Sequence, residues 1–112
     1  MKRDFELIRK LLLCVEGESV DLSSYTNDQI LYHKALLLES GLADGPKPHY
    51  ASRSSSEIPD KVIVRKLTWA GHDLIDGIRD EDRWKKVKKW LKDTGKIITL
   101  EALKEAVKAP FS

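Results

Sequence analysis

Residues 26–42 read TNDQILYHKALLLESGL and contain the clearest start and stop signals for a helix in the chain. Thr26 is a favoured N-cap residue, and Gln29 three positions later completes a capping box, in which each side chain bonds to the backbone of the other residue. Gly41 is typical of the position after a helix, because glycine adopts the left-handed backbone conformation without steric cost. An apolar stripe at helical spacing is formed by Ile30, Leu31, Leu37 and Leu38. The stretch therefore predicts a helix over residues 27–40.

The segment after this helix is rich in residues that break helices. Residues 43–61 read ADGPKPHYASRSSSEIPDK, in which proline, glycine and serine favour a solvent-exposed turn. Residues 49–53 and residues 61–67 can pair as two antiparallel strands, because the second segment carries three β-branched side chains in a row. The sequence thus predicts a β-hairpin with a loop at its tip.

Other helices are predicted on either side of this helix and hairpin. The first is indicated by apolar residues at spacings of three, four and three: Phe5, Ile8, Leu12 and Val15. Gly17 can end it, and the alternation around Val20 and Leu22 favours a short strand or an extended connector. Thr68 can cap a helix after the hairpin. Its expected inward residues are Leu74, Ile75 and Ile78.

The last third of the chain predicts two more helices. The acidic run at residues 80–82 suits the positive end of a helix dipole. Apolar residues follow it at helical spacing: Trp84, Val87 and Leu91. Thr99 can cap a final helix, whose apolar residues are Leu100, Leu103 and Val107. These helices are expected near residues 83–94 and 99–108.

Length and composition favour one small α+β domain. The chain has 112 residues, of which 41% are hydrophobic and 34% charged, as in an ordinary globular protein. Its net charge of +2 is too small for composition alone to indicate a general nucleic-acid coat protein. The single cysteine, Cys14, has no partner for an internal disulfide and is expected to be a small buried core residue. Because neither a signal peptide nor a membrane span is recognised, we expect a cytoplasmic protein.

The predicted elements follow one another in an informative order. A helix ending in SGLADG, residues 40–45, precedes the hairpin, and LTWAGHDLIDGIRD, residues 67–80, opens the next helix. This order resembles the winged-helix superfamily, which implies a winged-helix-like domain with a β-hairpin wing and additional C-terminal helices. The resemblance implies a winged-helix core over residues 1–80 and a helical extension over residues 81–112. Residues 17–26 leave little room for the first helix of a regular helix-turn-helix, so that element is expected to be shortened, missing or distorted.

Four stretches together cover most of the chain and carry a narrower resemblance. They are MKRDFELIRKLLL at the start, ILYHKALLLESGL in the middle, LTWAGHDLIDGIRDEDRWKKVKKWLKDTG and the closing TLEALKEAVK. These stretches are similar to a family of bacterial and bacteriophage proteins catalogued as domain of unknown function 2513. The resemblance implies a small cytoplasmic protein of bacteria, phages or prophages, with no catalytic residues to carry over.

A winged helix that binds duplex DNA places one helix in the major groove and its wing on the phosphates. The corresponding helix here carries one lysine against two acidic residues, which is a poor surface for approaching a polyanion. The candidate contacts are Asn27, Gln29, His33 and Lys34 on this helix, and Arg53, Lys61, Arg65 and Lys66 on the wing. Duplex DNA binding, as in transcriptional regulation, is therefore one hypothesis for the function.

A second basic surface is predicted on the helix near residues 83–94. Residues 1–60 contain 7 basic and 10 acidic residues, a net charge of −3, whereas residues 61–112 contain 13 basic and 8 acidic residues, a net charge of +5. Four lysines share one helix face at three- and four-residue spacings: Lys85, Lys88, Lys89 and Lys92. This basic stripe either neutralises phosphates, docks an acidic protein, or is only the solvated face of an amphipathic helix.

No pattern in the sequence indicates an enzyme or a metal site. The three histidines fall in different elements and have no metal-ligand spacing: His33, His49 and His72. Three aspartates recur at helical spacing, which a solvated helix face and a cap explain: Asp73, Asp76 and Asp80. Glycine-rich phosphate loops and nucleophile elbows do not occur in the sequence. We therefore predict a non-enzymatic protein without catalytic residues, metal or cofactor.

The aromatic residues bear on a second hypothesis, a protein-interaction module. The tryptophans are expected mostly in the core: Trp69, Trp84 and Trp90. Tyr32 and Tyr50 are the candidates for exposure. If both tyrosines lie together beside Leu31 or Leu38, the apolar patch indicates a homodimer or partner surface.

Both hypotheses describe a non-enzymatic macromolecule-binding module, such as a phage or prophage accessory protein. One partner is duplex DNA, and the other is a protein, as for an inhibitor or adaptor of a host system; a membrane partner is not expected. The helix over residues 27–40 separates them. Exposed basic residues continuous with the wing favour DNA, whereas an acidic or apolar face favours a protein partner.

Overall fold

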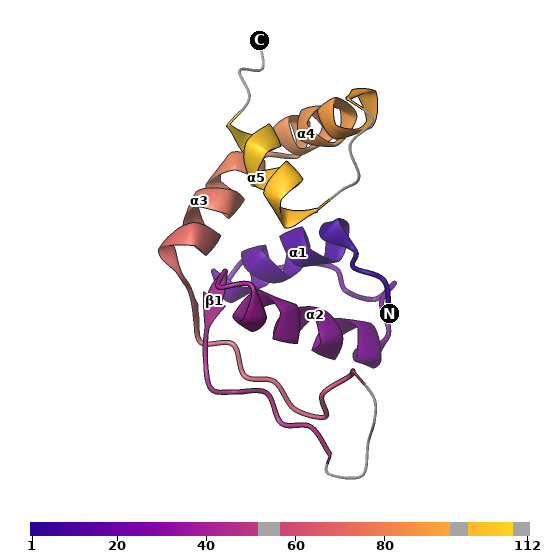
Figure 1. The fold of residues 1–112 in the computed structure, drawn as a ribbon, viewed down its shortest axis with the longest axis vertical. Coiled ribbons are helices and arrows are strands. Elements are labelled where there is room, and N and C mark those ends of the chain that lie inside the picture. Colours follow the sequence, from indigo (N-terminus) through magenta and orange to yellow (C-terminus); the bar gives the residue numbers. More distant parts are fainter. Residues whose placement is uncertain (52–56, 95–98, 109–112) are drawn as a thin grey trace. The chain divides into compact units, whose positions relative to one another are not determined.

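The computed structural model describes residues 1–51, 57–94 and 99–108 and shows an α+β protein (Figure 1). The helices are α1 Phe5–Val15, α2 Asn27–Glu39, α3 Trp69–Ile78, α4 Glu81–Asp93 and α5 Leu100–Val107. The strands β1 Ala43–Asp44 and β2 Lys66–Leu67 pair in antiparallel orientation. The chain divides into two compact units, Met1–His72 and Asp73–Ser112, with the boundary inside α3. This mixture of helices and paired strands confirms the α+β class.

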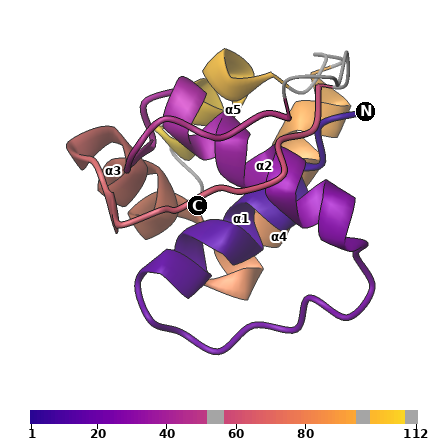
Figure 2. The same cartoon turned by 90° about the horizontal axis from the view of Figure 1, so that it is seen from below.

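In the first unit, α1 and α2 pack against each other, and the strand pair contacts both of them (Figures 1 and 2). The core of this unit is aliphatic, and its largest fully buried side chains include Leu7, Leu11, Leu12, Leu37 and Leu42. Burial of one such side chain stabilises a fold by about 1.5–3 kcal/mol. The packed pair of helices is therefore the main source of stability in this unit.

A buried histidine also joins α1 to α2. The side chain of His33 is 1% exposed, and its Nε2 atom accepts a hydrogen bond of 2.8 Å from the backbone N–H of Asp4. Its Nδ1–H donates to the carbonyl oxygen of Gln29 at 2.7 Å, so the ring is neutral with its proton on Nδ1. The carboxylate of Asp4 in turn caps α1 by accepting from the N–H groups of Glu6 and Leu7. The beginning of α1 is thereby fixed to the second turn of α2.

The start and stop signals of α2 are confirmed. Thr26 Oγ1 accepts from the N–H of Gln29 at 3.1 Å, and Gln29 Oε1 accepts from the N–H of Thr26 at 2.8 Å, which is the capping box. Gly41 has a φ of +77°, and the backbone around it forms the expected Schellman turn. Gly17 ends α1 in the same way with a φ of +92°. Local capping chemistry therefore defines both ends of α2 and the end of α1.

The hairpin between α2 and α3 forms, but its pairing differs from the expected one. β1 and β2 pair at its base, and beyond them a single bridge joins His49 to Lys61. The prediction of longer paired strands over residues 49–53 and 61–67 is therefore wrong for the residues that the structure describes. Two prolines in the first arm lack the N–H group that a continuous ladder requires. Of the two alternatives for the segment around Val20, a short strand or an extended connector, the strand does not form among the described residues.

Two residues expected in the core are exposed. Cys14 lies in the last turn of α1, beyond the part of that helix whose side chains are buried. Trp69 is 88% exposed, because it is the first residue of α3 and lies about half a turn around that helix from the buried Ile78. Trp84 is buried as expected, and Trp90 is half-buried.

In the second unit, α4 packs against α5 (Figure 1). The predicted inward residues of α3 and α4 are buried as expected: Leu74, Ile75, Ile78, Trp84, Val87 and Leu91. In α5 the buried residues are Ala102, Leu103 and Ala106, so the expectation is confirmed for Leu103, whereas Leu100 and Val107 are half-buried. The amphipathic pattern of these helices is thus realised in the fold, with small differences at the ends of α5.

One arginine joins three helices of the second unit. Arg83 of α4 donates to the carbonyl oxygen of Gly77 at 2.9 Å and to that of Val107 at 2.7 Å, where α3 and α5 end. Helix ends leave carbonyl groups without helical partners, so a guanidinium is well suited to this position. Gly77 also allows close packing, since a Cβ atom there would lie 2.1 Å from Cγ1 of Val107.

Replacement of His33 tests how much the link between α1 and α2 contributes to stability. We expect His33→Leu to lower the free energy of unfolding by about 1–3 kcal/mol, because the N–H of Asp4 loses its acceptor. Asn27→Ala, at an exposed position of the same helix, is expected to change it by less than about 0.5 kcal/mol. Urea unfolding followed by circular dichroism measures both values, and equal values for the two variants would contradict the assigned role of His33.

Candidate functional site

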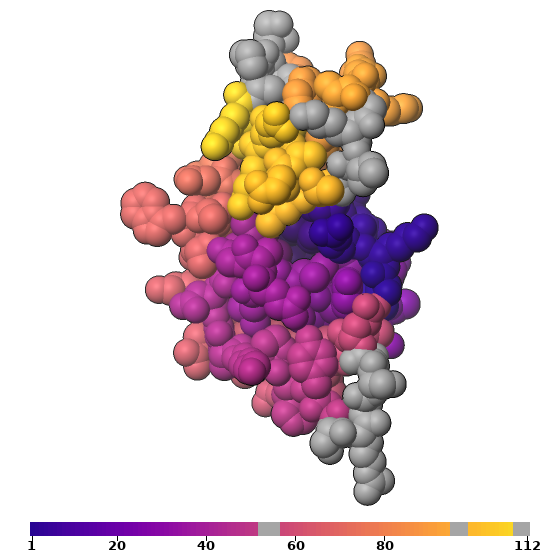
Figure 3. Space-filling view, viewed as in Figure 1, coloured from indigo at the N-terminus to yellow at the C-terminus, as the bar shows by residue number. Residues whose placement is uncertain are grey.

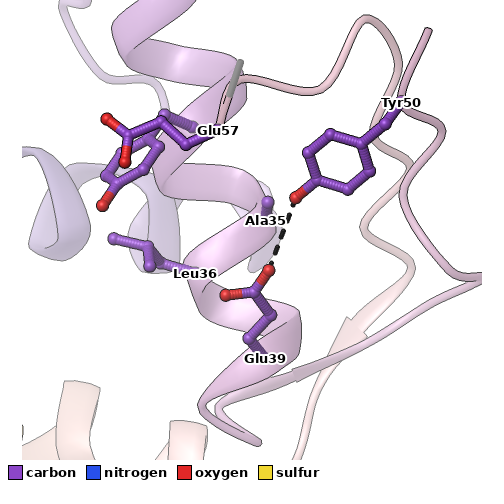
Figure 4. Close-up of a pocket in the computed structure, with 6 residues that line it drawn as sticks. Ala35, Leu36, Glu39, Tyr50 and Glu57 are labelled. Carbon is purple, nitrogen blue, oxygen red and sulfur yellow. Dashed lines mark hydrogen bonds between the residues drawn. The ribbon is translucent and has the colours of Figure 1, made fainter. Parts of the chain in front are cut away.

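A cavity lies between α2 and the hairpin in the first unit (Figure 4). Its volume is about 370 Å³, which falls within the range of about 300–1,000 Å³ typical of ligand sites. The residues that line it are Tyr32, Ala35, Leu36, Glu39, Tyr50 and Glu57. In Figure 3 the atoms of α2 and of the first hairpin arm lie next to each other on one face of this unit. Aromatic rings, apolar side chains and carboxylates therefore meet in one small site.

Four of the lining residues form one face of α2. Counted from Tyr32, the next three lie three, four and seven positions later, at Ala35, Leu36 and Glu39. These spacings bring all four onto the same side of a helix. His33 points into the core beside this face, and its ring meets that of Tyr32 edge-on at a centroid distance of 5.3 Å. The burial of His33 and Leu37 in the core thus helps to set which side of α2 faces the hairpin.

The hairpin contributes the opposite side of the cavity. The Tyr50 hydroxyl donates to Oε1 of Glu39 at 3.5 Å, which is a long hydrogen bond (Figure 4). Partial burial, followed by the charge of Glu39, raises the pKa of Tyr50 above its ordinary value of 10.0, so the hydroxyl remains a donor at neutral pH. Tyr32 and Tyr50, the two candidates for a shared apolar patch, both line this cavity, beside Ala35 and Leu36 and not beside Leu31 or Leu38.

Two carboxylates make the cavity acidic. Glu57 forms an ion pair with the N-terminal ammonium of Met1, whereas within the described part of the chain no cation pairs with Glu39. Glu39 lies in the last turn of α2, where the helix dipole disfavours negative charge. The long hydrogen bond from Tyr50 is therefore the one contact among the described residues that stabilises an acid at this position. The spacing from Tyr32 to Glu39 was visible in the sequence, but nothing in the sequence indicated that Glu57 would join them.

The residues of α2 that were predicted to contact DNA do not form one exposed set. Asn27 is exposed and Lys34 is half-buried, but the side chain of Gln29 is engaged in the capping box. His33 is buried with both ring nitrogens in hydrogen bonds, so the prediction that it contacts DNA does not fit its placement. Arg53, predicted on the wing, lies outside the described residues.

The remaining basic candidates lie on the surface. Lys61, Arg65 and Lys66 are exposed on the second arm of the hairpin. On α4, Lys85, Lys89 and Lys92 are exposed, and Lys88 is half-buried. The hairpin set belongs to the first unit and the α4 set to the second unit.

Histidine chemistry near the hairpin is structural. Nδ1–H of His49 donates to Oδ1 of Asp60 at 2.7 Å, and this hydrogen bond lowers the pKa of the Asp60 carboxyl below its ordinary value of 3.8. This side-chain pair lies at the bridge between His49 and Lys61 and so supports the hairpin.

Across residues 1–51, 57–94 and 99–108, no three side chains of His, Cys, Asp or Glu are grouped to hold a metal ion. The same residues include no helix long and apolar enough to cross a membrane.

Fold and cavity together describe a small α+β protein with an acidic, aromatic cavity beside a hairpin. The chain belongs to the family described as hypothetical protein DUF2513, whose sequence model matches residues 2–97. It is 32% identical to an uncharacterized protein of Haemophilus influenzae, in an alignment that covers 100% of this chain and 97% of the relative. No solved structure matches the chain. The family resemblance is thereby confirmed, whereas the winged-helix superfamily stays a prediction.

Proposed function

We propose that this chain is a non-enzymatic macromolecule-binding protein whose first unit binds a protein partner through the cavity between α2 and the hairpin. The observation that carries the proposal is the lining of the cavity, in which two tyrosines and Leu36 lie beside Glu39, a carboxylate that pairs with no described cation. Aromatic anchors in small pockets dominate the energetics of protein interfaces. An acidic and apolar face on α2 also disfavours the approach of a phosphate backbone.

The chemistry of the cavity defines the partner segment. A basic side chain is complementary to Glu39, and its aliphatic stem can pack on the rings of Tyr32 and Tyr50. A charge-assisted hydrogen bond to a carboxylate is about twice as strong as a neutral one, so a guanidinium is a better donor to Glu39 than the distant Tyr50 hydroxyl. The proposed ligand is therefore a peptide segment with an arginine or lysine next to an apolar residue.

Selection from a random peptide display library tests this proposal directly. We expect the selected peptides to share a basic residue and to bind Glu39→Gln and Tyr50→Ala at least about tenfold more weakly, as truncation of an interface hot spot predicts. Fluorescence anisotropy with labelled peptides measures the affinities. Glu18→Gln removes the same charge from an exposed residue outside the cavity and should leave the affinity unchanged.

Two outcomes of this selection would contradict the proposal. One is that the selected peptides lack basic residues, and the other is that Glu39→Gln and Glu18→Gln bind them equally well. Tyr50→Phe separates the contribution of the ring from that of the hydroxyl, and we expect it to bind almost as well as the parent chain. Circular dichroism of each variant shows whether the fold is retained.

Duplex DNA binding by the hairpin is a second candidate function. It is favoured by Lys61, Arg65 and Lys66, which are exposed together on one arm and have no ion pair among the residues described. In a winged-helix arrangement this arm would lie along the phosphate backbone. This candidate function does not include contacts between α2 and the edges of DNA bases. The side chains of Gln29 and His33 already form hydrogen bonds within the protein.

Replacement of these three residues by alanine tests the second candidate. If the hairpin binds duplex DNA, the affinity falls for every sequence, and the slope of log K against log salt decreases by about 1 for each phosphate that is no longer neutralised. A mobility assay at several salt concentrations measures both quantities. The hairpin candidate is eliminated if the triple variant keeps the affinity and the salt slope of the parent chain.

A further inference from the structure

The outer face of α4 is strongly basic. Residues 83–92 contain six basic residues and no acidic residue. The lysine face of α4, which we define as Lys85, Lys88, Lys89 and Lys92, lies at spacings of three and four residues. Lys85, Lys89 and Lys92 are exposed and form no ion pair with any described residue, and the ammonium of Lys88 lies 5.4 Å from the ring centroid of Trp84.

This concentration of charge is not explained by the stability of the helix. Like charges three or four positions apart on a helix repel one another and destabilise it. The acidic residues of α4 lie at its ends: Glu81, Asp82 and Asp93. Glu81 lies four positions before Lys85 and Asp93 four positions after Lys89, whereas Lys88 and Lys92 have no acidic residue of α4 three or four positions away. Helix stability alone does not account for the lysine face, whereas binding of an anionic partner does.

The apolar side of α4 shows which class of partner fits. Trp84, Val87 and Leu91 are buried, and Trp90 is half-buried, so the lysine face itself offers no exposed apolar anchor. Protein interfaces depend on buried aromatic or aliphatic anchors, and helices on membrane surfaces insert an apolar face. Nucleic-acid backbones instead bind to rows of cationic side chains without such anchors.

We propose that the lysine face of α4 binds the phosphate backbone of duplex nucleic acid without reading its sequence. From Lys85 to Lys92 the face extends about 10 Å along the helix axis, at 1.5 Å per residue, so its lysines can reach more than one phosphate of a duplex. Lysine acts as a point charge and lacks the planar fork with which arginine recognises guanine. The site lies in the second unit and is independent of the proposed peptide site in the first.

Fluorescence anisotropy with the full chain and two labelled DNA duplexes of unrelated sequence tests this proposal. We expect equal affinities for the two duplexes. In Lys85→Gln/Lys89→Gln we expect an affinity at least about tenfold lower near 50 mM salt and a salt slope smaller by about 2. Both lysines are exposed, so the variant should fold as the parent does.

A matched double variant on α5 is the control. Lys104→Gln/Lys108→Gln removes the same charge from the same unit, and we expect it to bind DNA within about twofold of the parent, as a change away from the phosphate-binding face predicts. The proposal is overturned if both double variants weaken binding equally, because the effect is then one of net charge. It is also overturned if the parent binds no duplex at low salt, or binds vesicles containing phosphatidylserine but not DNA.

Discussion

The hydrogen bond from the N–H of Asp4 to the buried ring of His33 is the constraint on which the first unit depends. It helps to set the rotation of α2 about its own axis, because the bond joins the buried ring to α1, while the buried side chains of Ala35 and Leu37 also face the core. Tyr32, Leu36 and Glu39 then face the hairpin and form one side of the cavity. A polar group buried in this way costs free energy unless it is paired, and here both ring nitrogens are paired. The cavity therefore follows from the core.

The two proposed surfaces have opposite charge and lie in different units. The cavity of the first unit contains the carboxylates of Glu39 and Glu57, whereas the central turns of α4 contain only basic charged residues. The charge division of the sequence does not follow the two units, since residues 1–72 contain 10 basic and 10 acidic residues and residues 73–112 contain 10 basic and 8 acidic residues. Net charges of 0 and +2 for the two units conceal the local charge of each surface. A chain that binds a basic peptide segment through one unit and a nucleic-acid backbone through the other would act as an adaptor.

Features set by neighbouring residues could be predicted from the sequence, and features set by distant contacts could not. The capping box at Thr26 and the turn at Gly41 were predictable because their partners lie within a few positions. The hairpin was expected, but the pairing of its two arms was not. The two prolines of the first arm have no backbone N–H group, and this limits which residues can form hydrogen bonds between the arms. Helical periodicity alone did not reveal that Trp69 is exposed and His33 buried. Tyr50 lies near Tyr32 only because of how the hairpin folds. The sequence could therefore indicate the two tyrosines as candidates, but it could not predict which residues line the cavity.

The protonation pattern of the His33 ring shows most sharply whether the core orients α2. A long-range correlation spectrum between imidazole protons and nitrogens distinguishes the two neutral tautomers. We predict one slowly exchanging ring with its proton on Nδ1 and an unprotonated Nε2 that accepts from Asp4. A proton on Nε2, or a ring that exchanges freely with water, would contradict this orientation, because His33 could then not accept a hydrogen bond from the N–H of Asp4.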